Sequence, residues 1–200
     1  MRFKSHYVPD FSNRNPEPIT NKLFSERWSP RAFKKATIPS VALEAIFDAA
    51  RWSPSCFNEQ PWQFITATAE AQNTHFERFL KLLVGANQVW AKNASLLGFI
   101  VAKRCFARND KTNPSANFDC GSAWMAMSLQ ANLFGLFSHA MAGIKYDEIY
   151  TALNIDADSH EVICGFALGV LDTPDSLPEA IQDDEKPSSR KPLKEIWQQY

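Results

Sequence analysis

The stretch RWSPSCFNEQPWQFIT, residues 51–66, marks the end of a helix, a polar turn and the start of a strand. The apolar residues before it recur at the spacing of a one-sided helix, at Leu43, Ile46, Phe47 and Ala50. Pro54 disfavours the helical conformation at Ser53, so we expect this helix to stop near Trp52. Polar side chains then follow at Ser55, Asn58 and Gln60. They predict a turn that faces a ligand, although ordinary turns carry the same residue types.

The spacing R-x-x-P-S-x-x-N-x-Q-P-W-x-F over residues 51–64 resembles the hallmark of the FMN-dependent nitroreductase family, including its helix-to-strand context. The resemblance continues to about residue 196. It implies an α+β fold in which a nitroreductase-like mixed β-sheet is flanked by helices, in a dimer. It also implies that the turn contacts FMN through Pro54, Ser55, Cys56 and Asn58.

Composition and charge narrow the class of protein. A chain of 200 residues with 45% hydrophobic residues fits one domain, here a single nitroreductase-like domain over residues 1–200. The net charge of -1 comes from scattered residues, without a basic stripe for nucleic acid or a cationic amphipathic helix for a membrane. The N-terminal residues lack the apolar run of a signal peptide. We therefore expect a cytoplasmic protein without nucleic-acid or membrane partners.

The four cysteines are widely spaced and form no C-x-x-C pair, and no histidine or carboxylate pair completes a zinc pattern. We expect no metal site. Cys56 lies in the polar turn, so a thiolate nucleophile is an alternative. That alternative needs a nearby base, and the four histidines show no signature of one.

Two arginines and a serine alternate in ERWSPRAF, residues 26–33. Guanidinium groups bind anionic oxygens through two parallel hydrogen bonds, and a hydroxyl adds another donor. Two arginines in a loop are also typical of solvated surface. The pattern R-x-S-x-R-x-F resembles the family's site for the flavin phosphate and ribityl chain, which implies FMN contacts from Arg27, Trp28, Ser29 and Arg31.

Apolar periodicity predicts the remaining elements. Helices are expected from Ser40, as a possible N-cap, to near Trp52, and over residues 70–84 and 147–153. Strands are expected over residues 62–67, 96–102 and 162–170. Residues 104–117 are polar and are interpreted as a loop near a substrate entrance. Residues 1–22 are expected to form an arm, and residues 172–200 an extended, solvated tail with proline and an acidic run.

The longest apolar segment is FDCGSAWMAMSLQANLFGLF, residues 118–137. It is interpreted as one helix that is apolar nearly all round, and such a helix is buried in a core or packed against a partner. Following F-D-x-G-x-A, it resembles the central helix of the family's dimer interface. The resemblance implies a homodimer whose flavin sites are shared between subunits.

Three further sites depend on the resemblance. Asn87 stands where the family often places an asparagine at the flavin's polar edge, although it also fits the polar end of a helix. A glycine loop of the family points backbone amides at the reactive edge of the ring, and here Ala142 and Gly143 occupy it, followed by Ile144 instead of the family's phenylalanine. The closing RKPLKEI, residues 190–196, resembles a segment whose basic residues return to the phosphate, which implies Arg190 and Lys191.

Taken as a whole, the resemblance implies an NAD(P)H-dependent FMN oxidoreductase, a flavoprotein. Hydride would pass from NADH or NADPH through flavin N5 to a small-molecule electron acceptor such as a nitroaromatic or a quinone. The family commonly uses no side-chain acid, base or nucleophile, and none is expected here. Two alternatives stay open at this point, another flavin reaction such as dehalogenation or flavin breakdown, and a non-catalytic FMN-binding protein.

Overall fold

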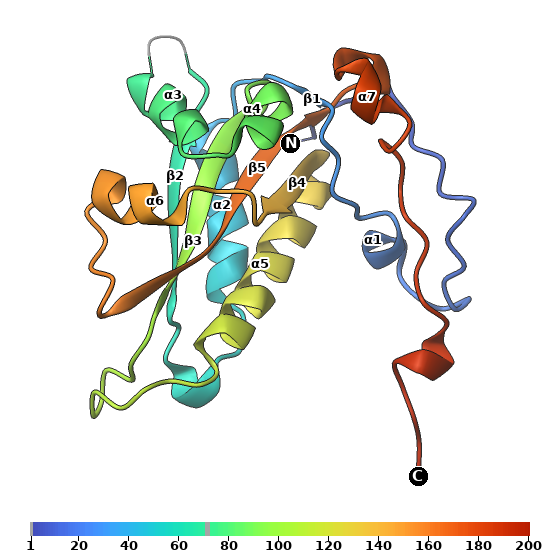
Figure 1. The fold of residues 1–200 in the computed structure, drawn as a ribbon. Coiled ribbons are helices and arrows are strands. Elements are labelled where there is room, and N and C mark those ends of the chain that lie inside the picture. The colour runs from blue at the N-terminus through green and yellow to red at the C-terminus, as the bar shows by residue number, and fades with distance from the viewer. Residues whose placement is uncertain (1, 71–72) are drawn as a thin grey trace.

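The computed structural model describes residues 2–70 and 73–200, and Figure 1 shows their arrangement. A five-stranded sheet is flanked by helices, which confirms the predicted α+β class. The strands are β1 (Phe33–Lys34), β2 (Trp62–Thr68), β3 (Leu96–Lys103), β4 (Leu136–Met141) and β5 (His160–Leu171). The helices are α1 (Lys22–Ser25), α2 (Ser40–Arg51), α3 (Thr74–Lys81), α4 (Gly85–Ala91), α5 (Ala116–Leu133), α6 (Tyr146–Leu153) and α7 (Glu179–Gln182).

The long strand β5 holds the sheet together because it has neighbours along both edges. Leu168 lies opposite Leu96 of β3 and Ser138 of β4, so these two strands flank β5. Val170 lies between Lys34 of β1 on one side and a residue of β4 on the other. β1 therefore pairs with β5 on the same side as β3, next to the end of that strand. All these pairs, and the pairing of β2 with β3, are antiparallel. The described sheet is therefore antiparallel, where we expected a mixed one.

Two hydrophobic cores lie on the two faces of the sheet. Strand β3 contributes alternately to both, with Leu97, Phe99 and Val101 in one core and Leu96, Ile100 and Ala102 in the other. The first core is completed by α3, α4 and α6, and the second by α2 and α5. Because successive side chains of a strand point to opposite faces, a strand that is covered on both sides must be apolar throughout. This explains the continuous run at residues 96–102.

One expected boundary is wrong. The apolar segment of residues 118–137 is not one helix, because α5 ends at Leu133 and β4 begins at Leu136. Gly135 lies between them with a φ of 76°, in the left-handed region that glycine adopts readily. The chain therefore leaves the helix there and enters a strand that the sequence did not indicate.

Other boundaries confirm or refine the expectations. The expected strands at residues 62–67, 96–102 and 162–170 are confirmed, as is the helix at residues 147–153. Ser40 is the first helical residue and makes no capping hydrogen bond, so the expectation of an N-cap was wrong, and Pro39 takes that place. The helix expected over residues 70–84 is shorter and followed by a second one, α4; residues 71 and 72 lie outside the described residues.

The N-terminal arm begins against the end of α5, where the Phe3 N–H donates to the Phe134 carbonyl, and its later part runs beside the C-terminal tail, away from the sheet (Figure 1). The side-chain amide of Asn13 donates to the Pro187 carbonyl over 2.6 Å. The tail is not wholly solvated as expected, since Leu177 and Glu185 are buried. Within the described residues, no helix has the length and apolar character needed to cross a membrane.

Candidate functional site: an arginine cavity, a glycine loop and a separate polar turn

A cavity of about 260 Å³ gathers most of the basic residues singled out in the sequence. Arg27, Ser29 and Arg31 line it from the segment before β1, and Arg190 lines it from the tail. A further arginine, Arg14, reaches it from the N-terminal arm. We call these four arginines, with Ser29, the guanidinium cradle. Such a concentration of donors is suited to a doubly charged anion such as a phosphate.

The backbone of the cradle is held by a buried carboxylate. Glu185 is 3% exposed, and its Oε1 accepts the backbone N–H of Arg31 over 2.7 Å and of Ala32 over 2.8 Å. Burial raises the pKa of this carboxyl, while the two hydrogen bonds lower it. Within the described residues, no ion pair joins a carboxylate to any of the four arginines. Glu185 therefore fixes the loop without neutralising the guanidinium groups.

His139 of β4 contacts the same loop through a hydrogen bond to its backbone. Its Nδ1 lies 3.0 Å from the Pro30 carbonyl oxygen, which can only accept, so this hydrogen bond requires the proton on Nδ1. The ring lies against Trp90 of α4, with centroids 4.8 Å apart. Burial lowers the pKa of His139, and the nearby charge of Arg31 acts in the same direction. A neutral histidine thus links the cradle to α4.

The electrostatics of the cradle favour an anion. Burial and the neighbouring charge of Arg190 lower the pKa of Arg27. Trp28 is 4% exposed, and its indole Nε1 is buried without a hydrogen-bond partner, as is Nη2 of Arg14. Unsatisfied buried donors are rare in folded proteins. The residues present therefore fit a phosphate-bearing group.

Asn87 and Gly143 are brought together beside α4. The Asn87 side-chain amide donates to the Gly143 carbonyl over 2.9 Å, and the backbone N–H of Val84 donates to it over 3.0 Å. A Cβ added to Gly143 would lie 2.6 Å from Asn87 Nδ2, so a larger residue would have to displace the Asn87 side chain. Asn87 lies in the first turn of α4, so the alternative that it belongs to the polar segment in which a helix ends was wrong. Trp90 of the same helix connects this pair to the cradle through His139.

The polar turn of residues 54–60 is built differently and lies elsewhere. Ser55 Oγ accepts the backbone N–H of Gln60 over 3.0 Å, and the backbone N–H of Cys56 donates to Asp119 Oδ2 of α5 over 3.1 Å. Phe57 and Asn58 have φ values of 53° and 58°. A bulky residue with positive φ is strained, and such strain concentrates at functional sites. In Figure 1 this turn, between α2 and β2, is at the bottom of the view, far from the cradle segment between α1 and β1.

An apolar hollow of about 760 Å³ lies next to the turn, on the outer side of α5 and the end of α2. Trp52 and Phe118 at its rim are 76% and 82% exposed. Its other lining residues are mostly small or apolar, at Ala49, Ser53, Pro54, Gly121, Ser122, Met125, Ala126 and Leu129. Exposed apolar surface of this extent is typical of a protein interface.

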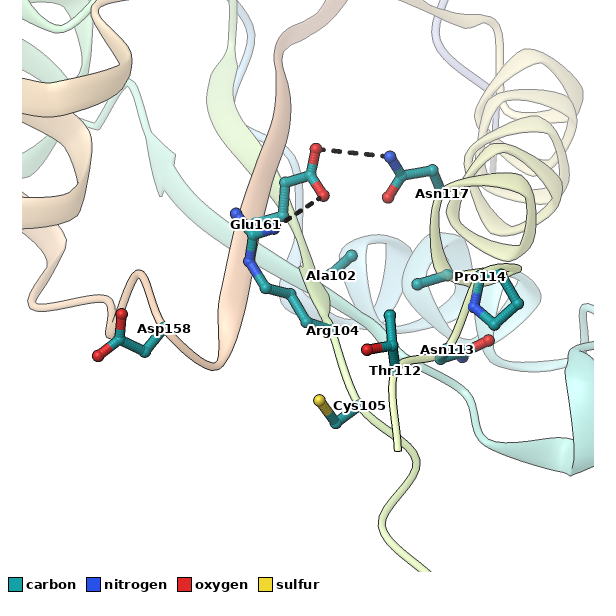
Figure 2. A pocket seen from close by; sticks show the side chains of 10 residues that line it. Ala102, Arg104, Cys105, Thr112, Asn113, Pro114, Asn117, Asp158 and Glu161 are labelled. Atoms are coloured by element: carbon teal, nitrogen blue, oxygen red, sulfur yellow. Dashed lines mark hydrogen bonds and ion pairs between the residues drawn. The ribbon is translucent and has the colours of Figure 1, made fainter. Parts of the chain in front are cut away.

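A further cavity of about 380 Å³ lies at the N-terminal end of α5 and contains none of the predicted site residues. Figure 2 shows Arg104 and Asn117 both directed toward Glu161. Arg104 lies 3.7 Å from Glu161, and the Asn117 amide donates to the same carboxylate over 3.5 Å. Because these polar groups already satisfy one another, this cavity is a weaker candidate than the cradle.

The structure thus divides the predicted residues into three groups. Arg27, Trp28, Ser29, Arg31 and Arg190 lie together in the cradle, Asn87 lies with Ala142 and Gly143, and the four turn residues lie apart. Lys191 does not line the cradle but a neighbouring cavity between arm and tail. Sequence reasoning missed Arg14, His139 and Glu185, whose roles come from contacts across long stretches of chain that no local spacing indicates.

Comparisons with known proteins identify the family of this chain. The model of the nitroreductase family matches residues 24–96, which include the cradle segment and the polar turn. The structure resembles that of an oxidoreductase containing FMN, with 37% sequence identity and a TM-score of 0.87 over 95% of this chain and 96% of that chain. The chain belongs to the nitroreductase family.

More distant members share the fold. A nitroreductase family protein from Streptococcus pneumoniae is 16% identical, with a TM-score of 0.70 over 90% of this chain and 98% of that chain. One from Clostridium difficile is 22% identical, with a TM-score of 0.65 over 88% of this chain and 95% of that chain. The search of curated proteins found no match.

Proposed function

We propose that the protein is an FMN-dependent oxidoreductase that uses NADH or NADPH as electron donor and reduces a small acceptor such as a nitroaromatic or a quinone. The observation that carries the proposal is the guanidinium cradle, in a chain 37% identical to an oxidoreductase that contains FMN. When bound, FMN would supply the hydride chemistry, accepting hydride at N5 from the nicotinamide and passing it to the acceptor. The protein's own groups bind and orient.

In this proposal each group of residues has one task. Arg27, Arg31 and Arg190 hold the phosphate, and the hydroxyl of Ser29 and the buried indole N–H of Trp28 offer further donors. The backbone N–H groups of residues 142 and 143 would stabilise negative charge on the bound flavin, as fixed dipoles do. Asn87 holds this loop in place through the Gly143 carbonyl.

We further propose a homodimer in which each flavin site takes its polar turn from the other subunit. None of the turn residues lines the cradle cavity, the two segments lie apart in the view of Figure 1, and the apolar hollow beside the turn offers a surface for a second copy. An obligate interface buries more than about 2,000 Å² and resembles a core cut in half. Pro54, Ser55, Cys56 and Asn58 would then complete the partner's site.

Anaerobic mixing tests the proposed activity. The purified protein, loaded with FMN, is mixed with NADH or NADPH and its flavin absorbance is followed. We expect the absorbance to bleach and to return when a quinone or nitroaromatic is added. Protein that takes up no FMN contradicts the cofactor assignment, whereas protein that binds FMN but is not bleached by either nucleotide contradicts the donor and indicates a non-catalytic flavin-binding protein.

A further inference from the structure

Arg14 reaches the cradle from the N-terminal arm, a segment in which the sequence indicated no chemistry. Its Nη1 donates to the Ser25 carbonyl over 2.5 Å and to the Arg27 carbonyl over 2.8 Å. Its Nε donates to the Ser188 carbonyl over 3.1 Å. The guanidinium group therefore joins the arm to both of the segments that carry the other cradle arginines.

The remaining nitrogen of Arg14 is the informative one. Nη2 is buried and has no hydrogen-bond partner in the part of the chain that the structure describes, although it belongs to a residue that lines the cavity. A buried donor without a partner costs about 1 to 3 kcal/mol, and more when the group is charged. Folded proteins therefore seldom leave one unless a ligand or water completes it.

The charges around Arg14 point to an anion as the missing partner. Burial and the charges of Arg190 and Arg27 lower the pKa of Arg14, which shows that like charges crowd this site. Two carboxylates, those of Asp184 and Glu185, line the cavity. Glu185 accepts hydrogen bonds from backbone N–H groups. Among the described residues, Asp184 forms no ion pair with an arginine. An anion that binds between these arginines would relieve the repulsion among their charges.

We propose that the guanidinium group of Arg14 binds the phosphate of FMN as a fourth arginine of the cradle, while its hydrogen bonds to the carbonyl groups of residues 25, 27 and 188 fasten the arm beside the cavity. The inference rests on the proposed function, because it takes FMN as the ligand. The arm is then a strap: Arg14 and Asn13 hold residues 187 and 188 of the tail, and with them Arg190, over the cavity.

A purely structural brace is the competing explanation. It accounts for the three hydrogen bonds to carbonyl groups and for the position of the guanidinium over Phe11, 5.4 Å from the ring centroid. It does not account for the buried Nη2, or for the finding that no carboxylate among the described residues pairs with Arg14. The two explanations differ in whether removal of Arg14 weakens the binding of the phosphate group alone or of the whole flavin.

Riboflavin, which lacks the phosphate, separates them. Protein stripped of flavin is titrated with FMN and, separately, with riboflavin, and quenching of flavin fluorescence gives the dissociation constants. For Arg14→Gln we expect FMN binding to weaken about tenfold or more, the scale of one hydrogen bond between charged groups, with riboflavin binding unchanged. Arg2→Gln removes an exposed arginine from the same arm and should change neither constant.

Two more variants separate contact from support. Asn13→Ala removes the hydrogen bond to the Pro187 carbonyl and leaves the guanidinium, so it should loosen the tail but keep most of the preference for FMN over riboflavin. Arg14→Lys keeps the positive charge but loses the planar guanidinium group that can donate two parallel hydrogen bonds, so it should keep part of that preference. This variant replaces Arg14→Gln in the experiment if the glutamine variant does not fold.

Equal weakening of FMN and riboflavin binding in Arg14→Gln and Arg14→Lys would show that Arg14 only braces the arm, and an unchanged FMN constant would remove it from the site. Failure of the unmodified protein to bind FMN would instead contradict the proposed function itself. The two failures are therefore distinguishable.

Discussion

The guanidinium cradle and the polar turn are both predicted from sequence motifs, yet the protein builds them in opposite ways. The cradle joins residues far apart in the chain, with Arg14, Arg27 and Arg190 around one cavity and Glu185 holding the loop. The turn is closed by a local hydrogen bond between Ser55 and Gln60, and its distant contacts are with Asp119 of α5 and with residues 106–108, not with the segments that form the cradle. One chain thus assembles the whole arginine cavity but leaves the turn beside an open apolar face. The difference supports a site shared between two copies of the chain.

A mixed dimer gives the largest expected effect. One subunit carries Arg27→Ala with Arg31→Ala, and the other carries Ser55→Ala with Asn58→Ala, each inactive alone. In a two-fold dimer with shared sites, one of the two sites takes both its cradle and its turn from unmodified segments. Random mixing of equal amounts should therefore restore about a quarter of the unmodified activity, measured as NAD(P)H oxidation with a quinone.

The control for this experiment is the formation of mixed dimers, followed by two different affinity tags. If tagged mixed dimers form and no activity returns while both parents are inactive, the turn serves the site of its own subunit. The comparison between cradle and turn would then have to be explained within one chain.

Gly121 tests the apolar hollow as the dimer interface. A Cβ at this exposed position of α5 meets nothing within 4 Å, so Gly121→Lys should leave the single chain folded, and replacement of a helical glycine even favours the helix. In a dimer packed across α5, the lysine would bury an unpaired charge and weaken association by about 3 kcal/mol or more. Sedimentation measures the dimer dissociation constant.

The matched control is Gly85→Lys, since a Cβ at Gly85 also meets nothing within 4 Å and this residue lies outside the hollow. We expect the Gly85 variant to stay dimeric. If the Gly121 variant associates as tightly as the unmodified protein, the interface lies on another face.

Asp119 tests how the turn is held. This residue is 3% exposed, and Asp119→Ala removes the acceptor of the Cys56 N–H, so it should lower the free energy of unfolding by about 1 to 3 kcal/mol. Asp147→Ala is the matched control, because Asp147 also lies in the first turn of a helix but is exposed. Denaturant titration that gives equal losses in both variants would leave only the helix dipole as the role of Asp119.

The sequence predicted the elements whose patterns are local. β3 and β5 are apolar runs covered on both faces, and Pro54 ends α2 by its own geometry. The sequence did not indicate the start of β4, because residues 118–137 stay apolar across the boundary between the helix and the strand. The boundary depends on Gly135, whose position against the Phe3 carbonyl belongs to contacts with the N-terminal arm that local periodicity does not contain.

The same distinction holds in the site. Arg27, Ser29 and Arg31 could be predicted because their spacing is a motif, and the structure does bring them together. Arg14 and Glu185 could not, since an arginine in a polar arm and a glutamate in an acidic run are typical of solvated surface. Only the folded chain shows that one is a buried donor without a partner and the other accepts two backbone N–H groups.

His139 gives the smallest expected effect and tests whether the cradle depends on pH. Its folded-state pKa is lowered, so between its ordinary value of about 6.5 and the lowered value the unfolded chain binds more protons than the folded chain. Acidification from pH 7.5 to 6 therefore favours unfolding. The expected loss of unfolding free energy is less than about 1 kcal/mol.

His139→Gln isolates this contribution because an amide can still donate to the Pro30 carbonyl but does not titrate in this range. The variant should lose less stability than the unmodified protein over the same interval. The raised pKa of Glu185 has the opposite effect on stability, because the folded chain keeps the proton of this carboxyl to a higher pH than the unfolded chain does. The stability that Glu185 contributes therefore falls as the pH rises through and above the ordinary pKa of a glutamate, near 4.5. Because Glu185 is present in both proteins, the difference between their denaturant titrations reports His139. Parallel curves would show that His139 does not gain its proton on unfolding, and the cradle would then be insensitive to pH in this range.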